Sequence, residues 1–327
     1  MRRSFLTVSL AAAGFLLWFS ACIAASPAGG LAVHTLRVGN EPEGIGVDET
    51  GGRAYIASSR SDTVTVIDTA TRLLLATIPV GHEPLGVAVD PGLGHVYVCD
   101  SLNARISVIG TREQKVIATV PVGTYPSGVA ANPVTHRVYV GNSGSNDVTV
   151  IDGTTLRAVA TVKAGLAAGS MAVDPHRNRA YCSNFGGASV SVIDGQTNQV
   201  IETLKVGLVP CTVVVDPEKE RGYVANSLDN SVSVFDLEPP RTLGQIKVER
   251  APVGMALDSS THRVYASNRG TGTVSIIEGM KVVGVAKVGQ APGGMAADAA
   301  GHVYVSNAGS NTVSVIDDRL ARTPRPP

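Results

Sequence analysis

The sequence predicts an all-β protein: a seven-bladed β-propeller with four-stranded blades, closed by its first strand. Three observations support this prediction. A unit of about 40 residues occurs seven times in one register, each unit holds four strand-like runs, and an unmatched run precedes the first unit. No helical hydrophobic period appears after the first 25 residues, so the repeat is a β unit rather than a helical one.

The repeat is marked first by a tyrosine that opens the second strand of every unit. The spacing is 42 residues five times and then 39, at Tyr55, Tyr97, Tyr139, Tyr181, Tyr223, Tyr265 and Tyr304. A valine-glycine pair or a close variant keeps the same register, starting at positions 38, 80, 122, 164, 206, 248 and 288. We expect the tyrosines to pack between blades and not to take part in chemistry.

The third unit shows what one blade contains. Its strand-like runs are residues 128–131, 137–140, 148–151 and 157–162. Between them lie Asn, Pro, Gly, Ser and Asp residues, which favour turns. The runs are apolar on both faces, as expected for a sheet that is covered on both sides by neighbouring blades.

The two ends of the repeat predict how the ring closes. The last unit has a third strand at 312–316 but no fourth, because the following segment, 319–327, is rich in Pro and Arg. The unmatched run at 32–39 resembles outer strands such as 116–123. We therefore expect it to complete the seventh blade and remove the open edges. This gives a propeller over residues 31–318 and a disordered Pro/Arg tail over 319–327.

Residues 1–25 have the layout of an export signal: a charged start, an apolar stretch over 8–21, and small residues near position 25. The start RRSFL resembles a twin-arginine signal, and FSAC, ending at Cys22, resembles a lipoprotein processing site. Residues 26–30 would form a short flexible tether. We expect an exported protein of the periplasm or cell surface, either soluble or lipid-anchored at Cys22, with no membrane span after signal removal.

Charge and cysteine content narrow the function. The chain has 27 basic and 27 acidic residues, and without Arg2 and Arg3 the basic count falls to 25, so no excess of positive charge favours nucleic acid. Three cysteines follow Cys22, which permits at most one internal disulfide. Cys99 and Cys182 replace small residues of the other units and are expected to be buried.

Three recurring motifs, Tyr-Val-x-Asn, Thr-Val-Ser-Val-Ile-Asp and Val-Gly-x-x-Pro-x-Gly, resemble the YVTN family of bacterial and archaeal surface or periplasmic β-propellers. The resemblance covers residues 31–318, with Ser58 and Asp100 in place of the usual Asn in the first two units. It implies the propeller fold and an extracytoplasmic location. It implies no single activity, because propellers carry many functions.

A propeller places its outer-to-inner links and its second-to-third-strand loops on one face, where ligands usually bind. Charged residues of these segments gather toward blades one and two, and two aromatic residues stand outside the tyrosine marker. The candidate binding residues are therefore Glu41, Glu43, Arg60, Asp62, His82, Glu83, Asp100, Arg105, Tyr125 and Phe185. Solvated loop residues are the simpler alternative for any one of them.

Two other sets suggest chemistry but have structural explanations. A carboxylate or Asn ends every inner strand, at 48, 90, 132, 174, 216, 258 and 298, and an Asx-turn accounts for each. Five histidines, at 95, 136, 176, 262 and 302, precede the tyrosine strands on the opposite face and are too dispersed for a metal site. No cofactor motif is evident, although a bound cation stays an open alternative.

Together these observations predict an exported, monomeric, non-enzymatic module that presents loops to a protein or small-ligand partner at the cell envelope. One alternative is a periplasmic hydrolase or lyase that uses His82 with Glu83 or Asp100. Another is an accessory subunit of an exported redox complex, suggested by the twin-arginine-like start.

Overall fold

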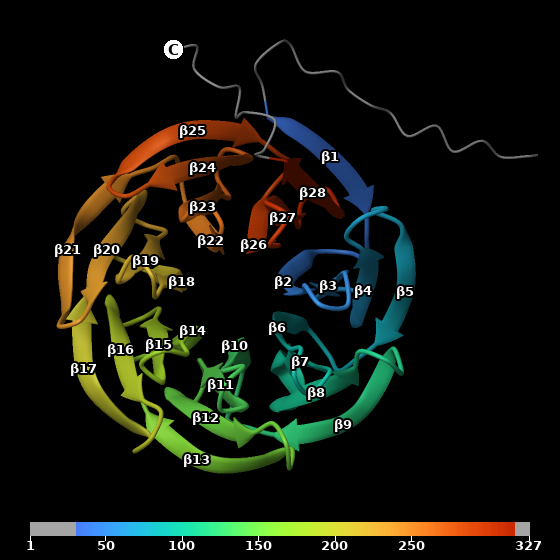
Figure 1. Ribbon diagram of the computed structural model, residues 1–327, viewed down its shortest axis with the longest axis horizontal. Helices are drawn as coiled ribbons and strands as arrows, with labels where there is room; N and C mark the ends of the chain where they lie inside the picture. The colour runs from blue at the N-terminus through green and yellow to red at the C-terminus, as the bar shows by residue number, and fades with distance from the viewer. Residues whose placement is uncertain (1–30, 318–327) are drawn as a thin grey trace, which may run out of the picture.

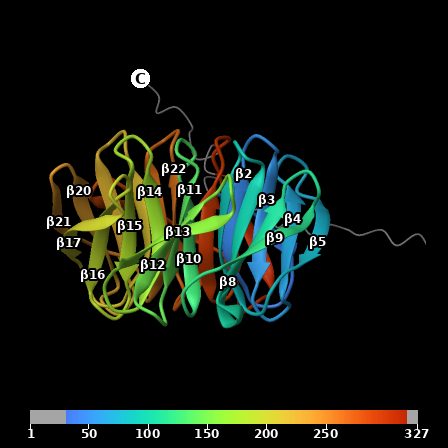
Figure 2. The same ribbon diagram turned by 90° about the horizontal axis from the view of Figure 1, so that it is seen from below.

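The computed structural model describes residues 31–317, which form a ring of seven four-stranded antiparallel sheets (Figure 1). In side view the strands run between the two faces of a disc (Figure 2). The predicted seven-bladed propeller is confirmed. The predicted export signal, the predicted tether and the predicted tail lie outside the described residues.

Each blade presents one inner strand to the central axis. The inner strands of blades one to seven are β2 (Pro42–Asp48), β6 (Pro84–Asp90), β10 (Pro126–Ala131), β14 (Ala168–Asp174), β18 (Pro210–Asp216), β22 (Pro252–Asp258) and β26 (Pro292–Ala297). The second strands are β3 (Arg53–Ser58), β7 (His95–Asp100), β11 (Arg137–Asn142), β15 (Arg179–Asn184), β19 (Arg221–Asn226), β23 (Arg263–Asn268) and β27 (His302–Asn307).

The two remaining strands of each blade lie further from the axis. The third strands are β4 (Thr63–Asp68), β8 (Arg105–Gly110), β12 (Asp147–Asp152), β16 (Ser189–Asp194), β20 (Ser231–Leu237), β24 (Thr273–Glu278) and β28 (Thr312–Asp317). The outer strands are β5 (Leu74–Pro79), β9 (Lys115–Pro121), β13 (Arg157–Lys163), β17 (Gln199–Lys205), β21 (Pro240–Lys247), β25 (Lys281–Lys287) and, for blade seven, β1 (Ala32–Arg37). A short 3-10 helix, η1 (Ser101–Asn103), connects β7 to β8.

The ring closes as the sequence predicts. Strand β1 pairs antiparallel with β28, from Ala32 opposite Asp317 to Arg37 opposite Thr312. The chain thus completes its last blade with its first strand and removes the edge that β28 would otherwise expose.

The hydrophobic core consists of seven clusters, each between two neighbouring blades. In one cluster, Tyr139 and Val150 of blade three pack with Met171 and Cys182 of blade four. All seven marker tyrosines are buried, which confirms their structural role. Because each blade buries both faces, every blade needs its two neighbours for stability.

The Asn of the Tyr-Val-x-Asn motif ties three parts of a blade together. In blade four the Asn184 side chain donates to the hydroxyls of Ser189 and Ser191, at 3.0 Å each, and accepts a hydrogen bond from the Gly165 N–H at 3.0 Å. The same three bonds recur at Asn226 and Asn307. The motif therefore fixes the outer-to-inner link onto the second and third strands.

The three cysteines of the described region are free thiols. Cys99 and Cys182 are fully buried, as expected, whereas Cys211 is half-buried at the central channel. Within residues 31–317 no helix is long and apolar enough to cross a membrane.

Deletion of residues 31–37 should destabilise the protein strongly, because it uncovers β28 and removes the packing of Val33 and Leu36. We expect the melting temperature to fall by at least ~10 °C with a broader transition. Deletion of residues 319–327 is the matched control and should leave the melting curve unchanged. A chain that lacks residues 31–37 and melts like the parent would contradict closure by β1.

Candidate functional site

The links and loops that the sequence placed on one face do lie together. Backbone hydrogen bonds join Ser59 to Glu41 at 3.0 Å, Ser101 to Glu83 at 3.2 Å and Ser143 to Tyr125 at 3.0 Å. We call this side of the disc the mouth face, since it surrounds one opening of the central channel. It is the face on which the ten candidate residues were expected.

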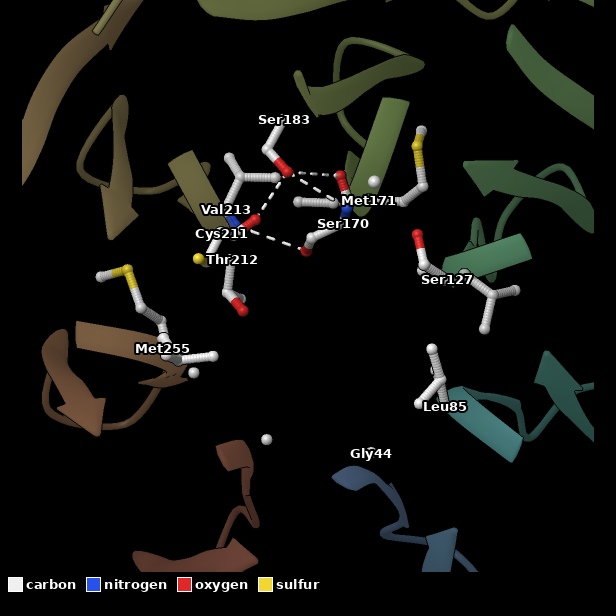
Figure 3. Close-up of a pocket in the computed structure, with 18 of the residues that line it drawn as sticks. Gly44, Leu85, Ser127, Ser170, Met171, Ser183, Cys211, Thr212, Val213 and Met255 are labelled. Atoms are coloured by element: carbon white, nitrogen blue, oxygen red, sulfur yellow. Dashed lines mark hydrogen bonds between the residues drawn. The ribbon is translucent and has the colours of Figure 1, made fainter. Parts of the chain in front are cut away.

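A cavity of about 970 Å³ occupies the channel. Its wall includes an apolar side chain from the same inner-strand position of every blade: Ile45, Val87, Val129, Met171, Val213, Met255 and Met295. Seen down the axis, Leu85 reaches toward the channel from β6 (Figure 3). The cavity is therefore mainly apolar, with a few polar groups, which is the usual composition of a small-molecule site.

The position before this apolar row is glycine in five blades, because neighbouring inner strands nearly touch there. A Cβ at Gly44, Gly86, Gly128, Gly254 or Gly294 would lie 1.9–2.9 Å from a carbonyl oxygen of the next blade. No side chain fits at such a distance. Blades four and five differ, since they carry Ser170 and Thr212 at this position.

Ser170 belongs to a hydrogen-bond network that joins blades four and five (Figure 3). The Ser183 hydroxyl donates to the Cys211 carbonyl at 2.6 Å, and the Ser170 N–H donates to the Ser183 hydroxyl at 3.1 Å. The Ser170 hydroxyl accepts a bond from the Val213 N–H at 3.4 Å. These hydroxyls and that of Thr212 make this sector of the channel wall more polar than the glycine sectors.

Several charged candidates serve the scaffold. Asp62 accepts a hydrogen bond from the Glu83 N–H at 3.0 Å and lies 2.8 Å from His82 Nδ1. The same bond to the next blade is made in other units by Asn146, Asn230 and Asn311. Asp62 thus occupies a position whose side chain accepts a hydrogen bond from the next blade in other units as well.

Asp100 lies inside blade two and not at the channel. Its buried carboxylate takes the place of the motif Asn and accepts hydrogen bonds from the Gly81 N–H at 3.1 Å, the Ser107 hydroxyl at 2.7 Å and Arg105 Nε at 2.9 Å. Arg105 is held by this contact. Both residues are therefore accounted for by the packing of the blade.

The remaining candidates lie at the mouth itself. Glu43, Tyr125 and Phe185 line the cavity, and the two aromatic side chains are 41% and 49% exposed. The Tyr125 hydroxyl donates to Glu83 at 3.0 Å, and Glu41 pairs with Arg60 at 3.1 Å. The ten candidates thus divide into residues that line the cavity and residues that lie outside its lining.

Glu43 is the residue with the least ordinary environment. Burial raises the pKa of its carboxyl, while Arg269 opposes the rise and the carboxylates of Glu41 and Glu83 add to it. Arg269 Nη2 lies 3.5 Å from Glu43, a longer contact than a normal hydrogen bond. Gly293 makes room for this pair, because a Cβ there would lie 3.1 Å from Glu43 Oε2.

Several site residues were not singled out from the sequence: the apolar row, Ser170, Thr212 and, as a partner of Glu43, Arg269. The available signal was the glycine position of the inner strand, which changes to a hydroxyl residue in only two units. The apolar row itself gives no signal, because its residues resemble those of any buried strand.

On the opposite face, the Asp and Asn residues at the ends of the inner strands form the predicted Asx-turns. Asp90 accepts the turn N–H of Gly92 at 3.1 Å, Asn132 that of Val134 at 2.9 Å, and corresponding bonds form at 48, 174, 216, 258 and 298. His136 Nδ1 lies 2.7 Å from Asp90, which links two blades. Among residues 31–317, no group of three or more His, Cys, Asp or Glu side chains is arranged to hold a metal ion.

Comparisons with known proteins support the fold and a repeat of the β-propeller type. A model of the NHL repeat matches residues 82–109, in blade two. A chain of hydrazine synthase from Kuenenia stuttgartiensis has a similar structure, with a TM-score of 0.78 and 20% identity over 86% of this chain and 97% of that chain. At this identity the similarity shows the fold alone. The search of curated proteins gave no match.

Replacement of Glu43 by Gln should leave stability at pH 7 unchanged or slightly increased. Because burial raises the folded-state pKa, the ionised carboxylate costs stability, and the cost grows as pH rises from the unfolded-state pKa through the folded-state pKa. We expect a melting temperature 0 to ~3 °C above the parent at pH 7 and no difference near pH 4. Glu202→Gln, on the exposed outer strand β17, is the control.

The half-exposed Arg269 stays hydrated in the Glu43→Gln variant, so loss of the ion pair should cost little. A fall of more than ~3 °C at pH 7 would show instead that the pair with Arg269 outweighs the burial of the carboxylate.

Proposed function

We propose that this protein is a non-enzymatic binding module that receives an apolar group of its partner in the mouth cavity. One observation supports this most: a mainly apolar cavity of about 970 Å³ opens on the loop face and has few polar groups in its wall. Its volume falls within the ~300–1,000 Å³ of small-molecule sites. β-Propellers commonly mediate interactions through this kind of face.

Binding is favoured over hydrolysis because the residues that a hydrolase would use already contact other groups of the protein. His82 lies against Asp62, Glu83 accepts the Tyr125 hydroxyl, and Asp100 is enclosed in blade two. General acid–base catalysis needs such groups within reach of one substrate atom. The accessory-subunit hypothesis stays a prediction, because the similarity to a hydrazine synthase chain concerns the fold only.

The cell envelope is the proposed location, on the evidence of the first 25 residues and the resemblance to the YVTN family. Ala32 pairs with Asp317 at the end of β28 that is remote from the mouth face. A tether that precedes Ala32, soluble or lipid-anchored, would therefore leave the mouth face free for a partner.

The binding proposal is tested with N-phenyl-1-naphthylamine, an apolar dye that is uncharged at neutral pH. We expect saturable one-to-one binding that Gly169→Leu weakens at least ~10-fold, because the new side chain narrows the cavity. A Cβ at Gly169 meets its nearest atoms at 3.6–3.7 Å, so the substitution begins without a clash. The repeat already carries leucine at the equivalent position 85.

Gly244→Leu on the outer strand β21 is the matched control and should bind the dye like the parent. Melting curves check that both variants fold. Absence of dye binding, or equal binding by both variants, would contradict the mouth cavity as the binding site.

Export is tested by expressing the complete chain in a Gram-negative host and fractionating the cells. We expect a processed protein in the periplasmic or envelope fraction, and its intact mass distinguishes the soluble form from one lipidated at Cys22. Cys22→Ala should release a lipidated form into the soluble periplasmic fraction and leave a soluble form unchanged. An unprocessed chain that stays in the cytoplasm would contradict export.

A further inference from the structure

We infer that the mouth cavity selects a small organic cation, an amine with an apolar body, whose ammonium group binds at Glu43. The inference rests on the proposed function and adds the chemical class of the ligand. It follows from the charge of the cavity wall, the contacts of Glu43 and the shape of the cavity.

The cavity wall carries a single formal charge at neutral pH, and that charge is negative. Among the described residues that line it, Glu43, Tyr125 and Cys211 are the ionisable ones. Burial raises the pKa of Cys211 to about 11, and burial with the bond to Glu83 raises that of Tyr125, so both stay neutral. A cation that enters the cavity therefore meets one carboxylate in the wall, which Arg269, outside the lining residues, contacts at 3.5 Å.

The rim does not cancel this charge. Glu41 is paired with Arg60, but Glu83 has the Tyr125 hydroxyl, which is uncharged, as its side-chain partner. On blade six, Arg269 faces Glu43, and Arg250 donates to the Gly270 carbonyl. Among these residues the four carboxylates of Glu41, Glu43, Asp62 and Glu83 outnumber the three guanidinium groups of Arg60, Arg250 and Arg269, and Arg105 is paired with Asp100.

Glu43 has acceptor capacity that Arg269 does not use. Its side chain is 25% exposed, and its ion pair with Arg269 is 3.5 Å long. A carboxylate can accept about four hydrogen bonds, whereas an ammonium group donates three. An ammonium group at Glu43 would form short charge-assisted bonds and offset the unfavourable burial of the carboxylate.

The rest of the site fits the apolar body of such a ligand. Ile45 of the apolar row follows Glu43 by two residues on β2 and also lines the cavity. Apolar wall therefore lies next to the carboxylate. Tyr125 and Phe185 offer exposed aromatic faces at the mouth, and aromatic faces attract both cations and apolar groups. Because inner strands of all seven blades enclose the cavity, it suits a small molecule better than a folded protein surface.

Two probes with the same fluorophore test the inference: dansylcadaverine, which ends in an ammonium group, and dansyl-6-aminohexanoic acid, which ends in a carboxylate. The parent should bind the ammonium probe at least ~10-fold more tightly, as expected for one charge-assisted contact in a partly buried site. Glu43→Gln should reduce this preference to less than ~3-fold, while the uncharged dye still binds as in the parent. Glu202→Gln should keep the full preference.

The outcomes separate the two proposals. If the uncharged dye binds and is blocked by Gly169→Leu, but the two charged probes bind equally, selection of a cation is wrong and the binding function stands. If the uncharged dye does not bind, the binding function itself is wrong. If a lysine-containing peptide binds and dansylcadaverine does not, the small-molecule assignment is wrong.

Discussion

The close approach of the seven inner strands is the constraint on which the structure depends. At five of the seven contacts, a carbonyl oxygen of one blade lies 1.9–2.9 Å from the position a Cβ would take in the preceding blade. Only glycine permits this distance. Hydroxyls of the second strands reinforce the contact between blades, since Ser183, Ser267 and Ser306 each donate to an inner-strand carbonyl of the next blade at 2.6–2.7 Å. The ring and the width of its channel follow from these contacts.

The same constraint limits which positions of the channel wall can carry a side chain. At the glycine position itself, only two units carry a larger side chain. These residues are Ser170 in blade four and Thr212 in blade five. Blade one keeps Gly44 there and carries Glu43 at the preceding position, beside Gly293. The Glu43 carboxyl is partly buried, and this burial raises its pKa.

Much of the fold could be predicted because the sequence pattern of one blade occurs seven times. The tyrosine marker, the missing fourth strand of the last unit and the run at 32–39 each have a local physical meaning, and closure of the ring follows from them. The Asx-turns were predictable for the same reason, since Asp or Asn at the end of a strand acts on its own neighbouring backbone.

The site was predictable only in part, because a binding role and a scaffold role use the same residue types. Asp62 and Asp100 belong to the predicted charged sector, yet one ties blade one to blade two and the other replaces the motif Asn inside its blade. The apolar cavity could not be predicted from the sequence of any single unit. It arises where the inner strands of seven blades surround an axis that no unit contains.

Methionine methyl NMR offers the most direct test of the mouth cavity as a ligand site. Met171, Met255 and Met295 line the cavity, whereas Met280 lies outside it and is 47% exposed. On titration of ¹³C-methyl-methionine-labelled protein with dansylcadaverine, the account predicts saturable shifts of the first three methyl signals and none at Met280. Unchanged signals from the three channel methionines, or shifts confined to Met280, would contradict the account.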